Sequence, residues 1–207
     1  MHAILSAVLM LLLLSILCGG IYPTLVTGLA RIFFPAQAEG SFLADHSGRV
    51  IGSRLIGQPF TDPKYLWPRP SATTDFAYNP MASGGSNRSP ANRDYLKDVA
   101  ERVQGLRAEG IHGPIAADLV QASGSGLDPH LSPQAAAVQI RRIARARGLR
   151  EERVAAVLGN HLLGRQFGFL GAPRINVLAV NLELDAIDRD APAGKDNRPS
   201  GQSLQTN

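Results

Sequence analysis

The stretch Ile4–Ile21, ILSAVLMLLLLSILCGGI, decides the organisation of this chain. No charged side chain occurs from Ala3 to Ala30, and the residues from Leu9 to Leu14 are all apolar. As a helix, this charge-free segment would extend about 42 Å at ~1.5 Å per residue, which exceeds the ~30 Å hydrocarbon thickness of a bilayer. The sequence therefore predicts a single transmembrane helix over about residues 4–28, within a membrane anchor of residues 1–30.

Two kinds of signal sequence are alternatives to a transmembrane helix. A cleaved signal peptide has a positively charged start and an apolar stretch of about 7–15 residues, whereas this chain begins Met1-His2 and its apolar run is longer. A lipoprotein signal is suggested by Cys18 followed by Gly19, but that processing needs a small residue before the cysteine, and Leu17 is large. We favour the spanning helix, which makes the rest of the chain a domain tethered to a membrane.

Four residues at the end of the stretch are candidates for contacts with lipid or with a partner helix. Gly19 and Gly20 would let another helix approach closely, although glycine is also simply tolerated in lipid. Tyr22 suits a membrane–water interface, and Pro23 should kink the helix or mark where it leaves the hydrocarbon. Because one span cannot form an ion pathway alone, we expect a multi-span partner if the protein takes part in transport. The flanking charges scarcely indicate the orientation of the span.

Composition limits the remainder of the chain to one ordinary domain. Residues 31–185 are enough for a hydrophobic core, and the polar residues 186–207 are predicted to be a disordered tail. The net charge of +4 does not by itself indicate a nucleic-acid partner, and none is expected. The single cysteine lies in the predicted span, so an intramolecular disulfide is excluded.

The order of predicted elements indicates an α+β fold, with a mixed domain of helices and a small sheet. Short strands are expected within residues 48–57, and an ordered but irregular segment within 58–90, where five aromatic residues argue against disorder. Asn92 and Ser132 are predicted to cap helices. The predicted helices span residues 92–109, 133–147 and 151–163, and the clearest predicted strand spans residues 175–184.

Six arginines surround the second and third predicted helices. We interpret them as a solvated helix face and not as a nucleic-acid or acidic-lipid contact, because Glu151 and Glu152 interrupt the run. Within the second helix, Ala137, Ile140 and Ala144 are expected to face the core. The arginines are Arg141, Arg142, Arg145, Arg147, Arg150 and Arg153.

The sequence lacks the motifs that would assign a reaction to this chain. It contains no phosphate-binding P-loop, no dinucleotide-binding glycine fingerprint and no Asp-Lys-Thr-Gly phosphorylation site of a P-type pump. The five histidines show no metal-ligand spacing, and Gly124-Ser125-Gly126 is too tightly spaced for a nucleophile elbow. No catalytic residue and no metal ligand are therefore predicted.

Two glycine-rich loops are the remaining candidate sites. Residues 123–133 could form a backbone nest for an anion or a partner carbonyl, with Asp128 and His130 within reach of each other, or could be a purely structural turn. Residues 78–87 could likewise bind a ligand through backbone amides or form a rigid multi-turn loop. The candidate docking or structural residues are Tyr78, Asn79, Pro80, Ser83, Gly84, Gly85, Ser86, Asn87, Ser123, Gly124, Ser125, Gly126, Asp128, Pro129 and His130.

Blocks spread from about Tyr22 to Asp185 resemble the C subunit of the Kdp potassium-transporting ATPase family. They occur in the family's order and with similar spacing, which makes the resemblance specific. The blocks include Tyr22-Pro23-Thr24, Gly52 to Phe60, Arg69-Pro70-Ser71-Ala72, Tyr78-Asn79-Pro80 with Ser83 to Asn87, Ala122 to His130, Gly164 to Gly171 and Pro173 to Leu178.

The resemblance implies a non-catalytic accessory subunit of an ATP-driven, high-affinity potassium uptake pump. It implies two partners, namely a channel-like potassium-binding subunit and a P-type ATPase catalytic subunit that hydrolyses the ATP. It also implies one pass through the bacterial inner membrane, with the domain on the extracytoplasmic side and the lipid bilayer as a further contact. No cofactor of its own is expected, although an effect on the ATP affinity of the catalytic subunit has been proposed for the family. The alternative is a stand-alone, membrane-anchored ligand-binding module or enzyme that uses Asp128 and His130.

Overall fold

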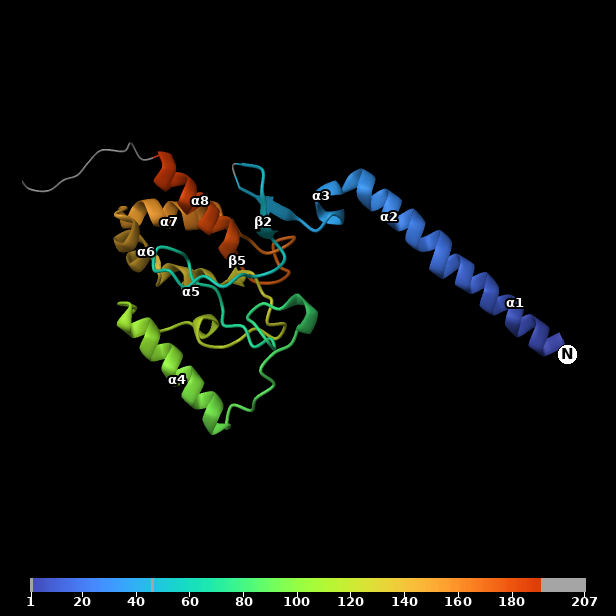
Figure 1. Ribbon diagram of the computed structural model, residues 1–207, viewed down its shortest axis with the longest axis horizontal. Coiled ribbons are helices and arrows are strands. Elements are labelled where there is room, and N and C mark those ends of the chain that lie inside the picture. The colour runs from blue at the N-terminus through green and yellow to red at the C-terminus, as the bar shows by residue number, and fades with distance from the viewer. Residues whose placement is uncertain (1, 46, 191–207) are drawn as a thin grey trace, which may run out of the picture.

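The computed structural model describes residues 2–45 and 47–190. Figure 1 shows a long N-terminal helix that projects from a domain of helices and short strands. This helix consists of α1 (His2–Ile16), a π-helical turn η1 (Leu17–Ile21) and α2 (Tyr22–Phe33). Its 32 residues are long and apolar enough to cross a membrane, and no part of its most apolar window is buried within the chain. The predicted long apolar N-terminal helix is confirmed.

The π-helical turn lies immediately before Pro23. The amide of Tyr22 donates to the carbonyl of Leu17, five residues earlier, and the hydroxyl of Thr24 donates to the carbonyl of Gly20 at 2.8 Å. A proline ring crowds the carbonyl four residues before it and offers no N–H, so a wider turn makes room for the ring. The irregularity expected at Pro23 is thus a local widening, and the helix continues through α2.

A short connection joins the long helix to the domain. After α3 (Pro35–Ala38), the antiparallel strands β1 (Phe42–Ala44) and β2 (Val50–Ser53) form a hairpin in which Phe42 lies opposite Ser53. The register shifts between Leu43 and Ala44, which marks a β-bulge. A strand was predicted within residues 48–57, and β2 confirms it.

The remaining elements form the body of the domain. The helical ones are η2 (Pro80–Ala82), α4 (Arg93–Ala108), η3 (Ala117–Leu119), α5 (Pro133–Ala137), α6 (Ile140–Arg147), α7 (Glu151–Asn160) and α8 (Val177–Asp190). The strands are β3 (His130–Leu131), β4 (Leu162–Leu163) and β5 (Arg174–Asn176), which pair in the antiparallel order β3-β5-β4. This arrangement confirms the predicted α+β class.

Two predicted caps are present, but two predicted helices differ in length. The side chains of Asn92 and Ser132 accept from the amides of Tyr95 and Ala135, as N-caps do. The helix predicted over residues 133–147 is divided into α5 and α6, and the one predicted to end at residue 163 ends at Asn160, followed by β4. Ala137, expected to face the core, is exposed.

The strand predicted over residues 175–184 is wrong beyond Asn176. Its start is β5, but α8 begins at Val177, because the same apolar residues also fit helical spacing: Val177, Val180 and Leu184 are buried. The side chain of Asn176 accepts from the amide of Ala179 at 3.0 Å and caps this helix. The helix continues to residue 190, past the expected domain end at 185, and the rest of the predicted tail lies outside the described residues.

Buried side-chain amides organise the irregular segment that precedes α4. Asn181 accepts from the amide of Leu66 at 2.7 Å and donates to its carbonyl at 3.0 Å. Gln139 pairs with the backbone of Trp67 in the same manner, at 2.9 and 3.1 Å. These amides take the place of a neighbouring strand, so the buried backbone groups are satisfied without sheet structure. The core beneath them includes Leu66, Leu131, Ile143, Val154, Ile175, Val180 and Leu184.

Candidate docking site

The two candidate loops lie against each other and form one structure. The amide of Gly84 and the hydroxyl of Ser83 both donate to the carbonyl of Ser125, at 2.9 and 3.0 Å. The hydroxyl of Ser71 donates to the carbonyl of Gly126 at 2.8 Å. Segments that are distant in the sequence are therefore held together mainly by backbone carbonyls, and we call residues 69–87 and 123–130 together the loop platform.

Glycine is required where the two loops come closest. Gly126 has φ +68°, and a Cβ at this position would lie 2.7 Å from the carbonyl oxygen of Gly84. A Cβ at Gly57 would lie 2.4 Å from the ring of Tyr78. A side chain at Gly126 would force the two loops apart and would also require an unfavourable left-handed backbone conformation. A side chain at Gly57, which lies outside the platform, would displace the ring of Tyr78.

Tyr78 and Asn79 fix the first loop from within. Tyr78 is buried at φ +61°, its hydroxyl donates to the carbonyl of Arg69, and burial raises the pKa of this hydroxyl. The buried side chain of Asn79 accepts from the amide of Met81 at 3.0 Å and donates to the carbonyl of Thr74 at 3.2 Å. Both residues therefore act as internal supports of the platform.

Asp128 connects the second loop to the first. Its carboxylate lies 3.0 Å from Nη1 of Arg69, accepts from the amide of His130 at 3.0 Å and lies 3.4 Å from Nδ1 of the same histidine. Burial by itself raises the pKa of Asp128, but the hydrogen bonds from His130 and the charge of Arg69 together lower it. The predicted proximity of Asp128 and His130 is confirmed, and the carboxylate is occupied by structural contacts.

Two amides of the second loop donate to acceptors within the loop itself. Gly126 donates to the carbonyl of Ser123 at 3.3 Å, and Leu127 donates to the hydroxyl of Ser125 at 3.1 Å. The carbonyl of Pro129 accepts from Val177 at the start of α8. These bonds are those of a structural turn, and the anion-binding nest stays a prediction. The predicted residues on the outer surface of the platform are Pro80, Ser83, Ser86, Asn87, Gly124 and Ser125, with Gly84 and Gly85 half-buried.

The candidate residues on the span leave an open helix face. Gly19 and Gly20 lie in the π-helical turn, and a Cβ on either would meet no heavy atom within 4 Å. Tyr22 is exposed, and a shallow groove on α2 is lined by Pro23, Thr24, Thr27, Gly28 and Arg31. The backbone of this face is accessible to a neighbouring helix.

The expected solvated arginine face is wrong for two of its members. Arg142 is buried, and the Arg147 side chain is only 1% exposed. Arg142 donates to the carbonyls of Pro63 and Tyr65, and its Cζ lies 3.8 Å from the centre of the Trp67 ring. Burial lowers the pKa of Arg142 to about 10, partly opposed by nearby carboxylates. The remaining arginines, Arg141, Arg145, Arg150 and Arg153, are exposed as expected.

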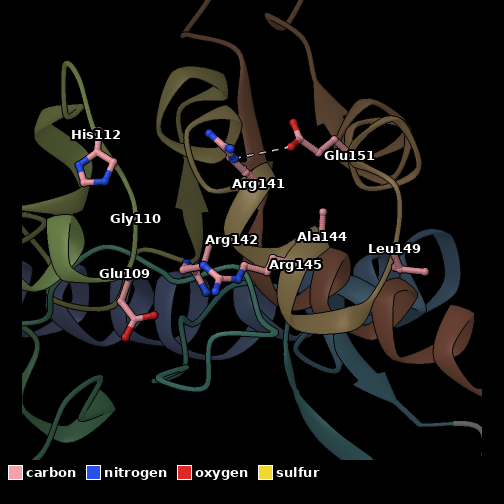
Figure 2. A pocket seen from close by; sticks show the side chains of 9 residues that line it. All are labelled: Glu109, Gly110, His112, Arg141, Arg142, Ala144, Arg145, Leu149 and Glu151. Carbon is pink, nitrogen blue, oxygen red and sulfur yellow. Dashed lines mark ion pairs between the residues drawn. The ribbon is translucent and has the colours of Figure 1, made fainter. Parts of the chain in front are cut away.

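A cleft of about 580 Å³ lies between the end of α4 and α6. Figure 2 shows Glu109 and His112 on one side and Arg141 and Glu151 across from them, with an ion pair of 4.0 Å between the last two. The cleft therefore mixes acidic and basic side chains and has no uniform charge. Among the residues that the structure describes, no group of three or more His, Cys, Asp or Glu side chains could hold a metal ion.

Several supporting residues could not be identified from the sequence. Arg69, Ser71 and Thr73 hold the platform from positions in a proline-rich segment without local periodicity. Gln139 and Arg142 meet in the interior at 2.6 Å, although both lie on a stretch that reads as a polar helix face. Gln139 and Arg142 differ from exposed polar residues only in being buried, and no pattern in the sequence predicts that burial.

Within the described residues, a membrane-length helix that the rest of the chain leaves uncovered precedes a domain with two interlocked loops, an arrangement typical of a membrane-anchored protein. In that domain, Asp128 and Arg142 are engaged in structural contacts.

Comparison with known proteins identifies the family. Residues 4–186 match the family described as KdpC, the c chain of the K⁺-transporting ATPase, and the chain belongs to this family. A potassium-transporting ATPase KdpC subunit from Geobacter metallireducens is 60% identical over 187 residues, which cover 90% of this chain and 99% of the relative. One from Geobacter sulfurreducens is 61% identical over 181 residues, 87% of this chain and 96% of the relative. The predicted accessory role in a potassium pump is confirmed, and the stand-alone module is not favoured.

Proposed function

We propose that this chain is a single-pass subunit of the bacterial inner membrane that assembles a channel-like potassium-binding subunit with a P-type ATPase catalytic subunit. The span contacts a helix of the channel-like subunit through Gly19 and Gly20, and the loop platform docks on the extracytoplasmic surface of the same subunit. The observation that carries the proposal is the combination, in one chain, of an uncovered apolar helix of membrane length with a loop platform held together by its own contacts.

The geometry of the platform supports docking. Its interior contacts leave little freedom for rearrangement, so binding a partner costs little conformational entropy. In Figure 1 the turn η2 lies on the side of the domain towards the long helix, and Met81 within it is 91% exposed. Met81 thus adds one exposed apolar side chain to the surface that we propose docks on the partner.

The proposed topology also limits any effect on ATP. If the domain lies outside the cytoplasm, it is separated by the bilayer from cytoplasmic nucleotide. An increase in the ATP affinity of the catalytic subunit would then be transmitted through the span and the partner, and this chain would hold no nucleotide itself. Labelling Ser86→Cys in intact cells with a membrane-impermeant maleimide tests the topology, since residue 86 is exposed and Cys18 lies within the span. Labelling only after cell lysis would contradict it.

The packing of the span can be tested with one bulky substitution. Gly20→Leu should reduce recovery of the partner subunits with this chain about tenfold or more, because the side chain would hold the helices apart. Ala7→Leu adds bulk to α1 away from the π-helical turn and serves as the control. Equal recovery with Gly20→Leu and with the wild-type chain would exclude this packing surface.

A further inference from the structure

The loop between β4 and β5 carries the most exposed aromatic side chains of the domain. Phe167 is 87% exposed and Phe169 is 69% exposed, and Leu170 beside them is 47% exposed. The platform contacts described above do not include these residues. Apolar side chains that gather on one ordered loop mark an interaction surface more strongly than scattered ones do.

This loop is ordered, and its backbone holds both rings outward. Gln166 and Leu170 exchange two backbone hydrogen bonds of 2.9 Å, and the amide of Gly168 donates to the carbonyl of Arg165 at 3.3 Å. Phe167 occupies φ +52°, which is unfavourable for a bulky side chain. The backbone of Phe167 is therefore strained, and in this strained conformation its aromatic ring is exposed to the surroundings.

The segment that contains this loop carries positive charge and no negative charge. From Leu162 to Arg174 it contains two arginines, Arg165 and Arg174, and no acidic residue. Leu162 and Leu163 of β4 extend the apolar surface, with exposures of 48% and 45%. Aromatic and aliphatic side chains combined with arginines are typical of segments that lie in the interface of a membrane with anionic lipids.

The position of the loop brings it close to the membrane anchor. The side chain of Asn176, at the end of β5, donates to the carbonyl of Arg54 at 2.9 Å, directly after β2. The hairpin containing β2 begins at Phe42, a short distance along the chain from the end of the long helix at Phe33. In the view of Figure 1, the connection that leads into β5 lies on the side of the domain from which α3 and the long helix depart.

We infer that the loop of residues 165–171 is a second membrane contact, in which Phe167 and Phe169 enter the lipid interface and Arg165 lies among anionic headgroups. This contact fixes the orientation of the domain on the bilayer, which a single tether would leave free to rotate. The partner is the lipid surface itself, so the contact is independent of pump assembly.

Tryptophan fluorescence of the full chain in nanodiscs tests this inference. Phe167→Trp or Phe169→Trp is placed in nanodiscs containing equal amounts of phosphatidylcholine and phosphatidylglycerol, with or without brominated acyl chains. The emission of Trp67, the only native tryptophan, is subtracted by using the unsubstituted chain. Brominated lipid should quench the added emission about twofold or more, as for an aromatic ring in the interface. Ala156→Trp, on the exposed face of α7, should not be quenched.

A second set of variants shows whether the native phenylalanines cause the insertion. Leu170→Trp should be quenched in the native background, and adding Phe167→Ser and Phe169→Ser should abolish the quenching. Because all three side chains are exposed, thermal unfolding should stay unchanged. Absence of quenching in every loop variant overturns the inference, as does a loop tryptophan that becomes shielded only when pump subunits are added. The first result comes from this chain alone and leaves the proposed assembly role untouched, whereas the second would assign the loop to a contact between subunits.

Discussion

Arg69 and Asp128 form an ion pair at 3.0 Å across 59 residues of sequence, and this pair joins the two halves of the loop platform. Each side chain is only about a quarter exposed, so the pair is shielded from solvent. Loss of the carboxylate would leave the guanidinium partly buried without its partner. The platform therefore depends on a contact that neither loop could form alone.

Asp128→Asn should lower the free energy of unfolding by about 1–3 kcal/mol, because the substitution removes the charge from a partly buried pair. Thermal or urea unfolding of the detergent-solubilised chain measures the loss. The exposed pair between Arg88 and Asp98 provides the control, since Asp98→Asn should cost no more than about 1 kcal/mol. Equal losses in the two variants would show that the position of the pair in the platform is unimportant.

The same carboxylate gives the platform a pH dependence. The hydrogen bonds and charge around Asp128 outweigh its burial and hold its pKa below the ordinary value of 3.8. Since the folded-state pKa is lower than the unfolded one, the stabilisation is complete above the unfolded pKa and is lost as the pH falls through the folded value. Below about pH 4, the stability advantage of the wild-type chain over Asp128→Asn should shrink. A constant difference in urea midpoint through this range would contradict the assignment.

Gly126→Ala should destabilise the chain by about 1–3 kcal/mol, because it combines a positive φ with a collision against the carbonyl of Gly84. Gly124→Ala in the same loop meets no atom within 4 Å and has no unfavourable φ, so it should stay within about 0.5 kcal/mol of the wild type. Comparing the two unfolding midpoints isolates the close approach of the loops. The close packing seen here would be contradicted if both alanines were tolerated equally.

Arg142→Met should cost about 2–4 kcal/mol, since it keeps much of the side-chain volume but leaves the carbonyls of Pro63 and Tyr65 without their donor. The adjacent Arg141 is 86% exposed, and Arg141→Met should change stability by no more than about 0.5 kcal/mol. Denaturant unfolding of the two variants makes the comparison. Similar stabilities would mean that the buried arginine is replaceable by a hydrophobic residue.

Local signals in the sequence predicted local structure well. The charge-free stretch gave the long helix, and the capping residues Asn92 and Ser132 located two helix starts, because a cap acts within a few residues of its own position. The loops 78–87 and 123–133 were both identified as constrained, since glycine and proline report backbone conformation directly.

Contacts between distant segments could not be predicted in the same manner. The alternation from Ile175 to Leu184 fits a strand and a helix equally well over a short window, and the cap at Asn176 decides for the helix. Arg142 appeared to be a surface residue because arginine is seldom buried, and the carbonyls that hold it lie more than seventy residues earlier. A hydrogen bond between residues so far apart forms only in the folded chain and produces no periodic pattern in the sequence.

The most direct test of the account is recovery of this chain in a mild detergent from cells grown at low external potassium, followed by identification of the proteins that accompany it. If this chain assembles the pump, the purified complex should contain a multi-span, channel-like potassium-binding subunit and a P-type ATPase subunit, both diminished by Gly20→Leu. Recovery of this chain alone, from cells that make those partners, would contradict the proposed assembly role.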